Sequence, residues 1–427
     1  MFGWEFPPFF AGGVGMVCYE LTKQLVDQGV DVDYVMPYFP EGNEPNFLNI
    51  VDVSKKVTEK ELEEQTKSGS FTITKVRSIL AAYQTQEEYE KTIKEISFQQ
   101  PKGLPPTKKS GDSTKELYGE NLLDEIHLFT KRVAILAEKG YFDKFDIIHA
   151  HDWTTVPAAA AVKRITGKPL VVHVHITDVN KNSGAGANPE IYAMEREGFF
   201  AADKIASVSQ YIKGTLMDEY GVPGEKIEVV HNGGITMEEP GLHDGTKFKE
   251  GNKLISYMGR VTGMKGPTNF VEMAPKILEH CPKTKFLLAG TGDQLQACID
   301  KTKELGIHDK FYFHGFYSKK EAEFFYDISD VFLMPSLMEP FGVVPLEAMS
   351  KKTPTVVSKQ SGVSEAISHC FKADSWDINK MASQVVTLLK YPQLHATMSQ
   401  NGYDEAQALT WEKPANECME LYNNLLR

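Results

Sequence analysis

The stretch VFLMPSLMEPFGVVPLEAMS, residues 331–350, indicates the fold class. Val331–Met334 is a short apolar run of the kind that forms a buried strand. A Pro-Phe-Gly turn follows, and we expect a helix to begin between Gly342 and Pro345, because proline is well tolerated in a first helical turn. A buried strand followed directly by a helix is the repeating unit of a parallel sheet covered by helices. The stretch therefore predicts an α/β protein.

The same alternation of apolar runs and helical stretches extends through the rest of the chain. Helices are predicted, for example, at residues 17–28 and 122–138. The expected strands are residues 32–37, 71–76, 146–149, 170–174, 204–208, 227–230, 254–258, 286–289, 311–314, 331–334 and 355–357. We predict two doubly wound parallel-sheet domains in tandem, facing each other across a cleft.

A polar segment at residues 237–252, which contains a proline and several glycines, interrupts the alternation and is predicted to be a linker. It separates a first domain, residues 1–236, from a second domain, residues 253–405. Within the first domain, residues 55–113 are charged, contain prolines and include only one clear strand. We interpret these residues as an insertion.

Composition excludes several classes of partner. Hydrophobic residues make up 41% of the 427 residues, yet no apolar run approaches the roughly 20 residues that a membrane-spanning helix needs. A net charge of −12 argues against general affinity for nucleic acid or anionic lipid. The five cysteines lack CxxC spacing and no charged-then-apolar leader is present, so we expect a reducing cytoplasm.

Ligands of open parallel sheets bind beyond the carboxyl ends of the strands, so the loops there are the candidate sites. The first loop carries Gly12, Gly13 and Gly15 ahead of a helix expected near Met16. Such glycines let backbone N–H groups approach an anion. A dinucleotide fingerprint needs a further glycine where Cys18 stands, which disfavours a Rossmann oxidoreductase. A plain strand-to-helix turn remains an alternative.

Histidines mark two more loops of the first domain. The sequence His149-Ala150-His151-Asp152 is expected to follow a strand at residues 146–148. Its spacing does not match a catalytic zinc motif, so we predict hydrogen bonding to a polyhydroxy ligand, or a structural role for His149.

The second histidine loop follows the strand at residues 170–174. His173 and His175 share a face of an extended chain. We expect His175 and Asp178 to face the cleft and His173 to face the sheet.

In the second domain, Arg260 and Lys265 lie on a glycine-containing loop after its first strand. A guanidinium and an ammonium at this spacing are suited to clamp a diphosphate. The alternative is a pair of solvated loop cations.

Two carboxylates, Glu339 and Glu347, flank the helix start of the quoted stretch. The amides of Gly342, Val343 and Val344 would be unpaired donors suited to an anion. Carboxylates repel phosphate but accept hydrogen bonds from sugar hydroxyls. Glu347 would also complement the helix dipole without any ligand.

Together these motifs resemble the retaining GT-B nucleotide-sugar glycosyltransferases, the broad group that includes glycogen and starch synthases. The resemblance covers nearly the whole chain. It rests on residues 4–8 and 12–15, 118–122 and 149–153, Gly259-Arg260 with Lys265-Gly266, and Glu339-Pro340-Phe341-Gly342 with Glu347. It implies two Rossmann-like domains: an acceptor-side domain, then a nucleotide-sugar-binding domain. It also implies a final helix, within residues 406–427, that returns to the first domain.

The resemblance also implies roles for individual residues. Arg260 and Lys265 match the pair that holds the donor diphosphate, Glu347 the glutamate on the ribose, and Glu339 the glutamate beside the transferred sugar. His151 or His175 would face that sugar, with the choice between them open. Acceptor-side candidates are Asp152 and Asp178. Further donor-site candidates are Gly12, Gly13, Gly15, Gly290, Gly292, His314, Phe316, Phe341, Gly342, Val343 and Val344.

The implied reaction is transfer of a sugar, with a glucosyl group as the leading expectation, from a nucleoside-diphosphate sugar to a saccharide acceptor such as an α-glucan. The anomeric configuration would be kept by same-face attack assisted by the leaving phosphate. Protein cations would take the place of a metal ion, so no cofactor is expected. Alternatives are a glycosyltransferase of cell-envelope or small-molecule glycoconjugates and a non-catalytic nucleotide-sugar-binding subunit.

Overall fold

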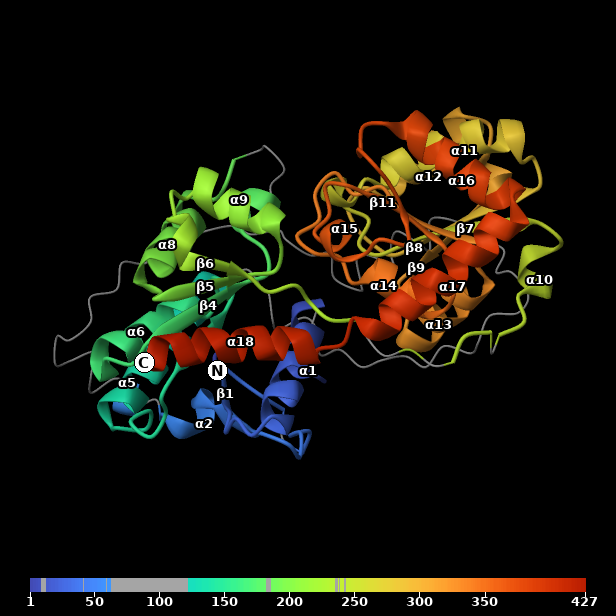
Figure 1. The fold of residues 1–427 in the computed structure, drawn as a ribbon. Coiled ribbons are helices and arrows are strands. Elements are labelled where there is room, and N and C mark those ends of the chain that lie inside the picture. The colour runs from blue at the N-terminus through green and yellow to red at the C-terminus, as the bar shows by residue number, and fades with distance from the viewer. Residues whose placement is uncertain are drawn as a thin grey trace. The chain divides into compact units, whose positions relative to one another are not determined.

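The computed structural model describes residues 1–8, 13–40, 42–58, 60–62, 122–181, 186–234, 237, 239–241 and 243–427. The predicted strand at residues 71–76, most of the predicted insertion, Gly12 and residues 118–121 lie outside this description. The chain divides into two compact units (Figure 1). One takes in the described residues up to Asn232 together with Trp411–Arg427, and the other runs from Gly233 to Thr410.

The first unit is built on parallel strands. A four-stranded sheet has the order β3-β4-β5-β6, and β1 pairs with β2. Residues 1–3 connect the two, because Phe2 bridges both Val35 of β1 and Ala150 of β3. The strands are β1 (Asp33–Met36), β2 (Asn49–Asp52), β3 (Ile148–His151), β4 (Leu170–Val174), β5 (Lys204–Ser207) and β6 (Ile227–Val229).

Helices cover these strands, and the last helix of the chain packs on the first. Apolar side chains of α1, among them Leu21 and Leu25, share a core cluster with Ala415, Cys418 and Leu421 of α18. The two helices lie side by side in Figure 1. The helices of this unit are α1 (Gly13–Asp27), α2 (Val53–Lys56), α5 (Leu122–Glu138), α6 (Val156–Thr166), α7 (Asp178–Lys181), α8 (Pro189–Ala201), α9 (Gln210–Asp218), the short η1 (Gly224–Lys226) and α18 (Glu412–Leu426).

The second unit holds a six-stranded parallel sheet of order β12-β11-β10-β7-β8-β9. The chain builds outward from β7 in one direction and then from β10 in the other, which is a doubly wound topology. The strands are β7 (Lys253–Met258), β8 (Thr284–Ala289), β9 (Phe311–Gly315), β10 (Val331–Met334), β11 (Thr355–Ser358) and β12 (Phe371–Ala373). The predicted α/β class is confirmed.

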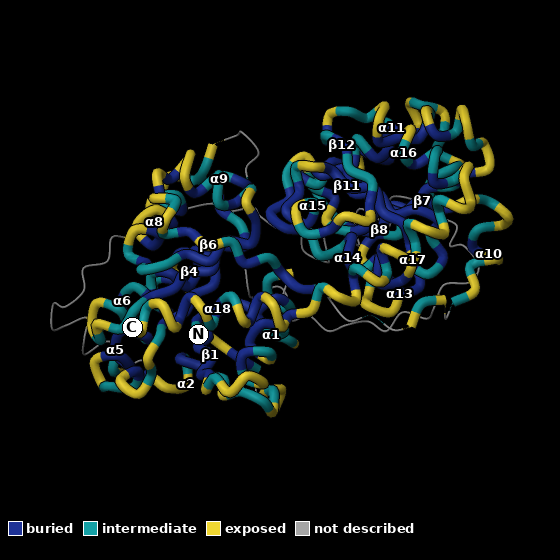
Figure 2. The backbone as a smooth tube through the Cα atoms, in the orientation of Figure 1, coloured by how far each residue is buried: buried dark blue, intermediate teal, exposed yellow. Residues whose placement is uncertain are grey.

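Helices lie on both faces of this sheet (Figure 1). The strands are buried and the outer faces of the helices are exposed (Figure 2). On one face, α11, α12 and α16 pack into one apolar core with residues of β7, β8 and β10. The helices are α10 (Thr246–Lys249), η2 (Gly263–Lys265), α11 (Pro267–His280), α12 (Leu295–Glu304), η3 (His308–Lys310), α13 (Lys319–Ile328), α14 (Val344–Ser350), α15 (Val363–Ala366), α16 (Ile378–Lys390) and α17 (Pro392–Ala408).

Two sequence-based predictions of local structure were wrong. Strand β3 reaches His151, so His149 and His151 lie within the strand and not in a loop after it. Helix α1 begins at Gly13, ahead of the expected start near Met16. The predicted linker contains α10, whose Phe248 is buried against Tyr312 and Phe324. The edge strands β2 and β12 were not predicted, because each offers only a few apolar residues.

Among the described residues, no helix combines the length and apolar character needed to cross a membrane.

Candidate functional site

The second unit places the predicted cations and carboxylates at one edge of its sheet, the edge formed by the carboxyl ends of the strands. Arg260 and Lys265 follow β7, and Glu339 follows β10, the strand that pairs with β7. The strand order reverses between these two strands, and crevices at such switch points are where α/β sheets bind ligands. The loops after β7 and β10 are about 75 residues apart in the chain, and they therefore meet at the switch point where a ligand site was expected.

Lys265 and Glu339 form an ion pair at this edge, with the ammonium donating to Glu339 Oε2. Their side chains are 18% and 7% exposed, respectively. Burial lowers the pKa of Lys265, and the neighbouring charge of Arg260 lowers it further, whereas Glu339 opposes both effects. Arg260 itself is exposed. The lysine is therefore a desolvated cation held by one carboxylate, beside a second cation open to solvent.

Backbone hydrogen bonds hold Glu339 in place. Its N–H donates to Gln360 O (3.0 Å), and its carbonyl accepts from the N–H of Gly362 (3.0 Å). Gly342 turns with φ +90°, and a Cβ there would lie 2.8 Å from Cγ of Glu339. A glycine at 342 therefore lets the turn close over the carboxylate.

Glu347 lies in the first turn of α14, as predicted, and Pro345 occupies the helix start. Tyr326 of α13 donates its hydroxyl to Glu347 Oε2 (2.7 Å). Burial raises the pKa of Glu347, and the tyrosine hydrogen bond partly opposes that rise. Gly342, Val343 and Val344 lie at this helix start, where main-chain N–H groups have no acceptor within the helix.

Gly290 and Gly292 support the loop that carries Arg260. A Cβ on Gly290 would lie 1.7 Å from Gly259 O, and one on Gly292 would lie 2.3 Å from Val261 O. The Val261 N–H donates to Thr291 O (2.7 Å), which ties the two loops together. The contacts of these glycines are thus with the protein's own backbone, and their predicted contact with a donor remains a prediction.

The aromatic candidates differ in exposure. His314 is packed between Phe325 (ring centroids 4.7 Å apart) and Glu321 Oε1 (3.3 Å). Its pKa is lowered, chiefly by burial. Phe341 is buried, whereas Phe316 is 65% exposed.

In the first unit, His149 and His151 of β3 lie beside His173 and His175 of the β4 segment. His151 and His173 are register partners, and all four side chains are at most 6% exposed. His151 Nδ1 lies 3.0 Å from His175 Nε2, so the two candidates for facing the sugar form one hydrogen-bonded unit. His149 Nδ1 pairs with the hydroxyl of Tyr422 on α18, which fits a structural role for His149.

The carboxylates of Asp152 and Asp178 accept hydrogen bonds from backbone N–H groups. Asp152 Oδ1 accepts from the N–H groups of His175 (2.7 Å) and Ile176 (3.3 Å), and burial raises its pKa to about 6. Asp178 Oδ2 accepts from the Asn188 N–H (2.6 Å). The side chains of Asp152, Asp178 and His175 are buried, and the expectation that Asp178 and His175 face the cleft remains a prediction. These carboxylates organise the loop after β4.

Gly13 is exposed and Gly15 is buried, both in the first turn of α1.

Tyr326 is a site residue that the sequence reasoning missed. It lies in the apolar run FFYDI of α13, where an aromatic residue is most simply interpreted as core. Its hydroxyl meets Glu347 only through the packing of α13 beside α14.

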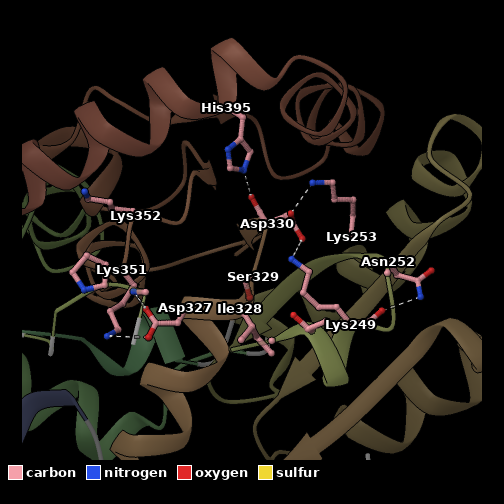
Figure 3. Close-up of a pocket in the computed structure, with 15 residues that line it drawn as sticks. Lys249, Asn252, Lys253, Asp327, Ile328, Ser329, Asp330, Lys351, Lys352 and His395 are labelled. Carbon is pink, nitrogen blue, oxygen red and sulfur yellow. Dashed lines mark hydrogen bonds and ion pairs between the residues drawn. The ribbon is translucent and has the colours of Figure 1, made fainter. Parts of the chain in front are cut away.

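A cavity of this unit lies at the amino ends of β7 and β10, opposite the candidate site (Figure 3). This cavity of about 650 Å³ is bordered by Lys253 at the start of β7 and Asp330 ahead of β10. Asp330 accepts from Lys249 (2.6 Å), Lys253 (3.0 Å) and the Leu254 N–H (2.8 Å). Burial raises the pKa of Asp330, but these donors outweigh burial and the pKa is lowered. Lys249 and Lys253 therefore form ion pairs with the buried carboxylate of Asp330.

Comparison with known proteins identifies the family. Residues 1–228 match the family described as the starch synthase catalytic domain, and residues 240–405 match the family described as glycosyl transferases group 1. The chain belongs to the starch synthase family of glycosyltransferases. As a member of this family it is a hexosyltransferase enzyme with the GT-B fold, as the sequence predicted.

Two curated relatives are similar over most of their length. An uncharacterised glycosyltransferase of Methanocaldococcus jannaschii is 28% identical over 86% of this chain and 82% of its own. A glycogen synthase of Mycobacterium tuberculosis is 24% identical over 86% of this chain and 79% of its own.

Solved structures share the GT-B fold at low identity. Sucrose-phosphate synthase from Thermosynechococcus elongatus superposes with a TM-score of 0.69 at 18% identity, covering 97% of this starch synthase family member and 94% of that chain. Anabaena HepE, solved in complex with UDP-glucose, has a TM-score of 0.57 at 19% identity. The superposition covers 69% of this chain and 82% of the HepE chain.

Proposed function

We propose that this glycosyltransferase moves a glucosyl group from a nucleoside-diphosphate sugar to a saccharide acceptor such as an α-glucan, with retention of anomeric configuration. The glycogen synthase relative supports the choice of glucose and glucan, and the UDP-glucose complex of HepE supports a nucleotide-sugar donor. The observation that carries the proposal is the part-buried Lys265–Glu339 pair beside Arg260 at the switch point of the second sheet.

Donor binding would rearrange this ion pair. Cleavage of the glycosidic C–O bond leaves negative charge on the diphosphate, and Arg260 and Lys265 would stabilise that charge. The partly desolvated ammonium of Lys265 would interact with an added anion more strongly than an exposed lysine. Glu339, released from Lys265, would then accept hydrogen bonds from hydroxyls of the transferred sugar.

Other residues complete the proposed donor site. Glu347, oriented by Tyr326, would accept from the ribose hydroxyls. The amides of Gly342, Val343 and Val344 would add donors for the diphosphate. His151 or His175 would contact the transferred sugar, and transfer would proceed by same-face attack without a metal ion.

The test is turnover with ADP-, UDP- and GDP-glucose in the presence of EDTA, with the product anomer read by NMR on a glucan acceptor. Retained α-configuration and turnover in EDTA are expected. Inversion, or strict dependence on an added metal, would contradict the mechanism.

A matched pair of variants isolates Lys265. Lys265→Met removes the charge at nearly constant volume, and we expect kcat to fall about 100- to 1000-fold, the usual cost of losing one preorganised donor at a developing anion. Lys285→Met breaks the exposed Lys285–Glu250 pair (2.6 Å) and should leave kcat unchanged. Equal effects of the two variants would refute a diphosphate role for Lys265.

Acceptor screening separates the remaining alternatives. Transfer to glucan supports the proposal, and transfer only to a small polyol phosphate or lipid acceptor would place the enzyme with glycoconjugate transferases. Donor binding with no turnover on any acceptor would indicate a non-catalytic subunit.

A further inference from the structure

The four buried histidines of the first unit form a stack that hydrogen bonding inside the protein does not satisfy. Ring centroids lie 4.6 Å apart for His149 and His151, 4.5 Å for His173 and His175, and 5.3 Å for His151 and His175. Among the described residues, no hydrogen-bond partner is found for His149 Nε2, His151 Nε2, His175 Nδ1 or either ring nitrogen of His173. Buried polar atoms without partners are rare, and they mark positions where a ligand or ion can bind.

Burial favours the neutral form of these histidines, because it lowers the pKa of each ring. Neutral imidazole is a preferred ligand of zinc and related divalent ions.

A thiol lies beside the stack. Cys18 comes from α1 and is 1% exposed. The candidate ligand atoms of Cys18, His151 and His175 lie within 4.8 Å of one another. In a tetrahedral zinc site, ligand atoms are about 3.3–3.8 Å apart, so side-chain shifts of about 1 Å would bring the three onto one ion. Cys18 is also the residue that breaks the dinucleotide glycine pattern in the sequence.

We propose that Cys18, His151 and His175 form a binding site for a borderline-soft divalent transition metal such as Zn²⁺ or Co²⁺. Three protein ligands leave a fourth position open. Binding releases the thiol proton to solvent as the Cys18 thiolate coordinates the ion. The ion would occupy the histidines predicted to face the sugar, so the metal site lies outside the proposed transfer mechanism.

A second triad competes for the same ion. Ligand atoms of His149, His151 and His173 also lie within 4.8 Å of one another. We favour the Cys18 triad because a thiolate brings charge to the ion, and because its ligands come from three separate segments that close around one point. His149 is already engaged by Tyr422.

The test is Co²⁺ titration of the metal-free, full-length protein without substrate, followed by absorbance. We expect one ion per chain, with a thiolate-to-cobalt charge-transfer band and the strong visible bands of tetrahedral Co²⁺. Zinc-edge X-ray absorption of the Zn²⁺-loaded protein should show one sulfur at about 2.3 Å. The absence of sulfur from the shell, or no binding, would overturn the proposal.

Variants locate the site. Cys18→Ser should abolish the charge-transfer band, and both Cys18→Ser and His175→Gln should weaken Co²⁺ affinity at least 10-fold, with circular dichroism confirming that each folds. Cys298→Ser changes a fully buried thiol of the second unit and should alter neither property. Loss of binding in His173→Gln but not in Cys18→Ser would place the ion in the other triad and overturn the assignment. Because no substrate is present, failure here leaves the transferase proposal intact.

Discussion

Lys265 and Glu339 lie 74 residues apart in the chain and form a part-buried ion pair in the second unit. The pair exists because β7 and β10 are neighbours in the sheet, so the loops at their carboxyl ends meet. One member would hold the diphosphate and the other the sugar. On this proposal, the donor would have to separate the two paired groups.

We predict that the Lys265–Glu339 pair makes nucleotide binding pH-dependent. Glu339 raises the pKa of Lys265 against the effects of burial and Arg260, so Glu339→Gln lowers that pKa further. A lysine loses its charge above its pKa, and binding of a sugar-free nucleoside diphosphate should therefore fall off at a lower pH in Glu339→Gln than in wild type. Thermal stabilisation by the nucleotide across the alkaline range measures this.

The control for that experiment is Glu250→Gln, which removes the partner of exposed Lys285. Its pH dependence should match wild type. An unchanged alkaline limb in Glu339→Gln would show that Lys265 is not the titrating cation.

Tyr326 positions Glu347 through one hydrogen bond. Tyr326→Phe removes that donor and raises the pKa of Glu347 further, since the hydroxyl stabilises the carboxylate. We expect donor affinity to weaken about 10-fold, the usual contribution of a hydrogen bond to a charged group. Calorimetric titration of Tyr326→Phe against Tyr192→Phe, whose hydroxyl donates to Glu219 O (2.7 Å) in the first unit, tests this. Equal affinities would remove Glu347 from the donor site.

Because Gly290 has no side chain, its loop can pack closely against the backbone of the loop that carries Arg260. Gly290→Ala places a Cβ against Gly259 O at a φ of +143°, so the two loops must separate. We expect a loss of about 2–4 kcal/mol in the free energy of unfolding and a higher donor KM. Gly263→Ala, on the same loop, meets no atom within 4 Å and is the matched control. A neutral result for Gly290→Ala in denaturant titrations would contradict the packing argument.

Glu195 makes stability fall with rising pH. Burial raises its pKa from 4.5 to about 8, although Tyr220 and the Asp178 N–H donate to it. The folded state holds the proton between these values, so its contribution is complete below pH 4.5 and is lost as pH rises to about 8. Relative to Glu195→Gln, wild type should lose up to about 1.4 kcal/mol of unfolding free energy per pH unit in this window.

Urea denaturation of the full-length protein from about pH 5 to pH 9 measures that slope. Glu197→Gln, on the exposed side of the same helix, should follow wild type throughout. Parallel curves for wild type and Glu195→Gln would mean that the carboxylate is charged in the folded protein.

Much of the fold was predictable because each strand and helix has a local pattern. The run at residues 331–334 is apolar throughout and that at 170–174 is apolar except for His173, and both became strands with the predicted bounds. The helix at residues 122–138 likewise has the predicted bounds. The pattern missed the end of β3, since His149 and His151 are polar and enter the sheet only because Phe2 on one side and β4 on the other supply hydrogen bonds.

The candidate site was predictable in residue type but not in contacts. Arg260, Lys265, Glu339 and Glu347 stand out locally, as cations on a glycine-containing loop and carboxylates around a helix start. Asp152 and Asp178 also appeared available for ligands, yet their carboxylates bond to backbone amides of the loop after β4. A carboxylate is equally suited to a sugar hydroxyl and to a peptide N–H, so local chemistry alone does not distinguish these uses.

The order of apolar runs, prolines and glycines along the chain is enough to specify an α/β protein with tandem parallel sheets, because periodicity and turn chemistry act over a few residues. The pairing of Lys265 with Glu339, the stacking of four histidines beside Cys18 and the bond from Tyr326 to Glu347 depend on which strands and helices become neighbours. Strand order is a property of long-range packing, and it brings together side chains whose distance along the chain carries no information about their distance in space.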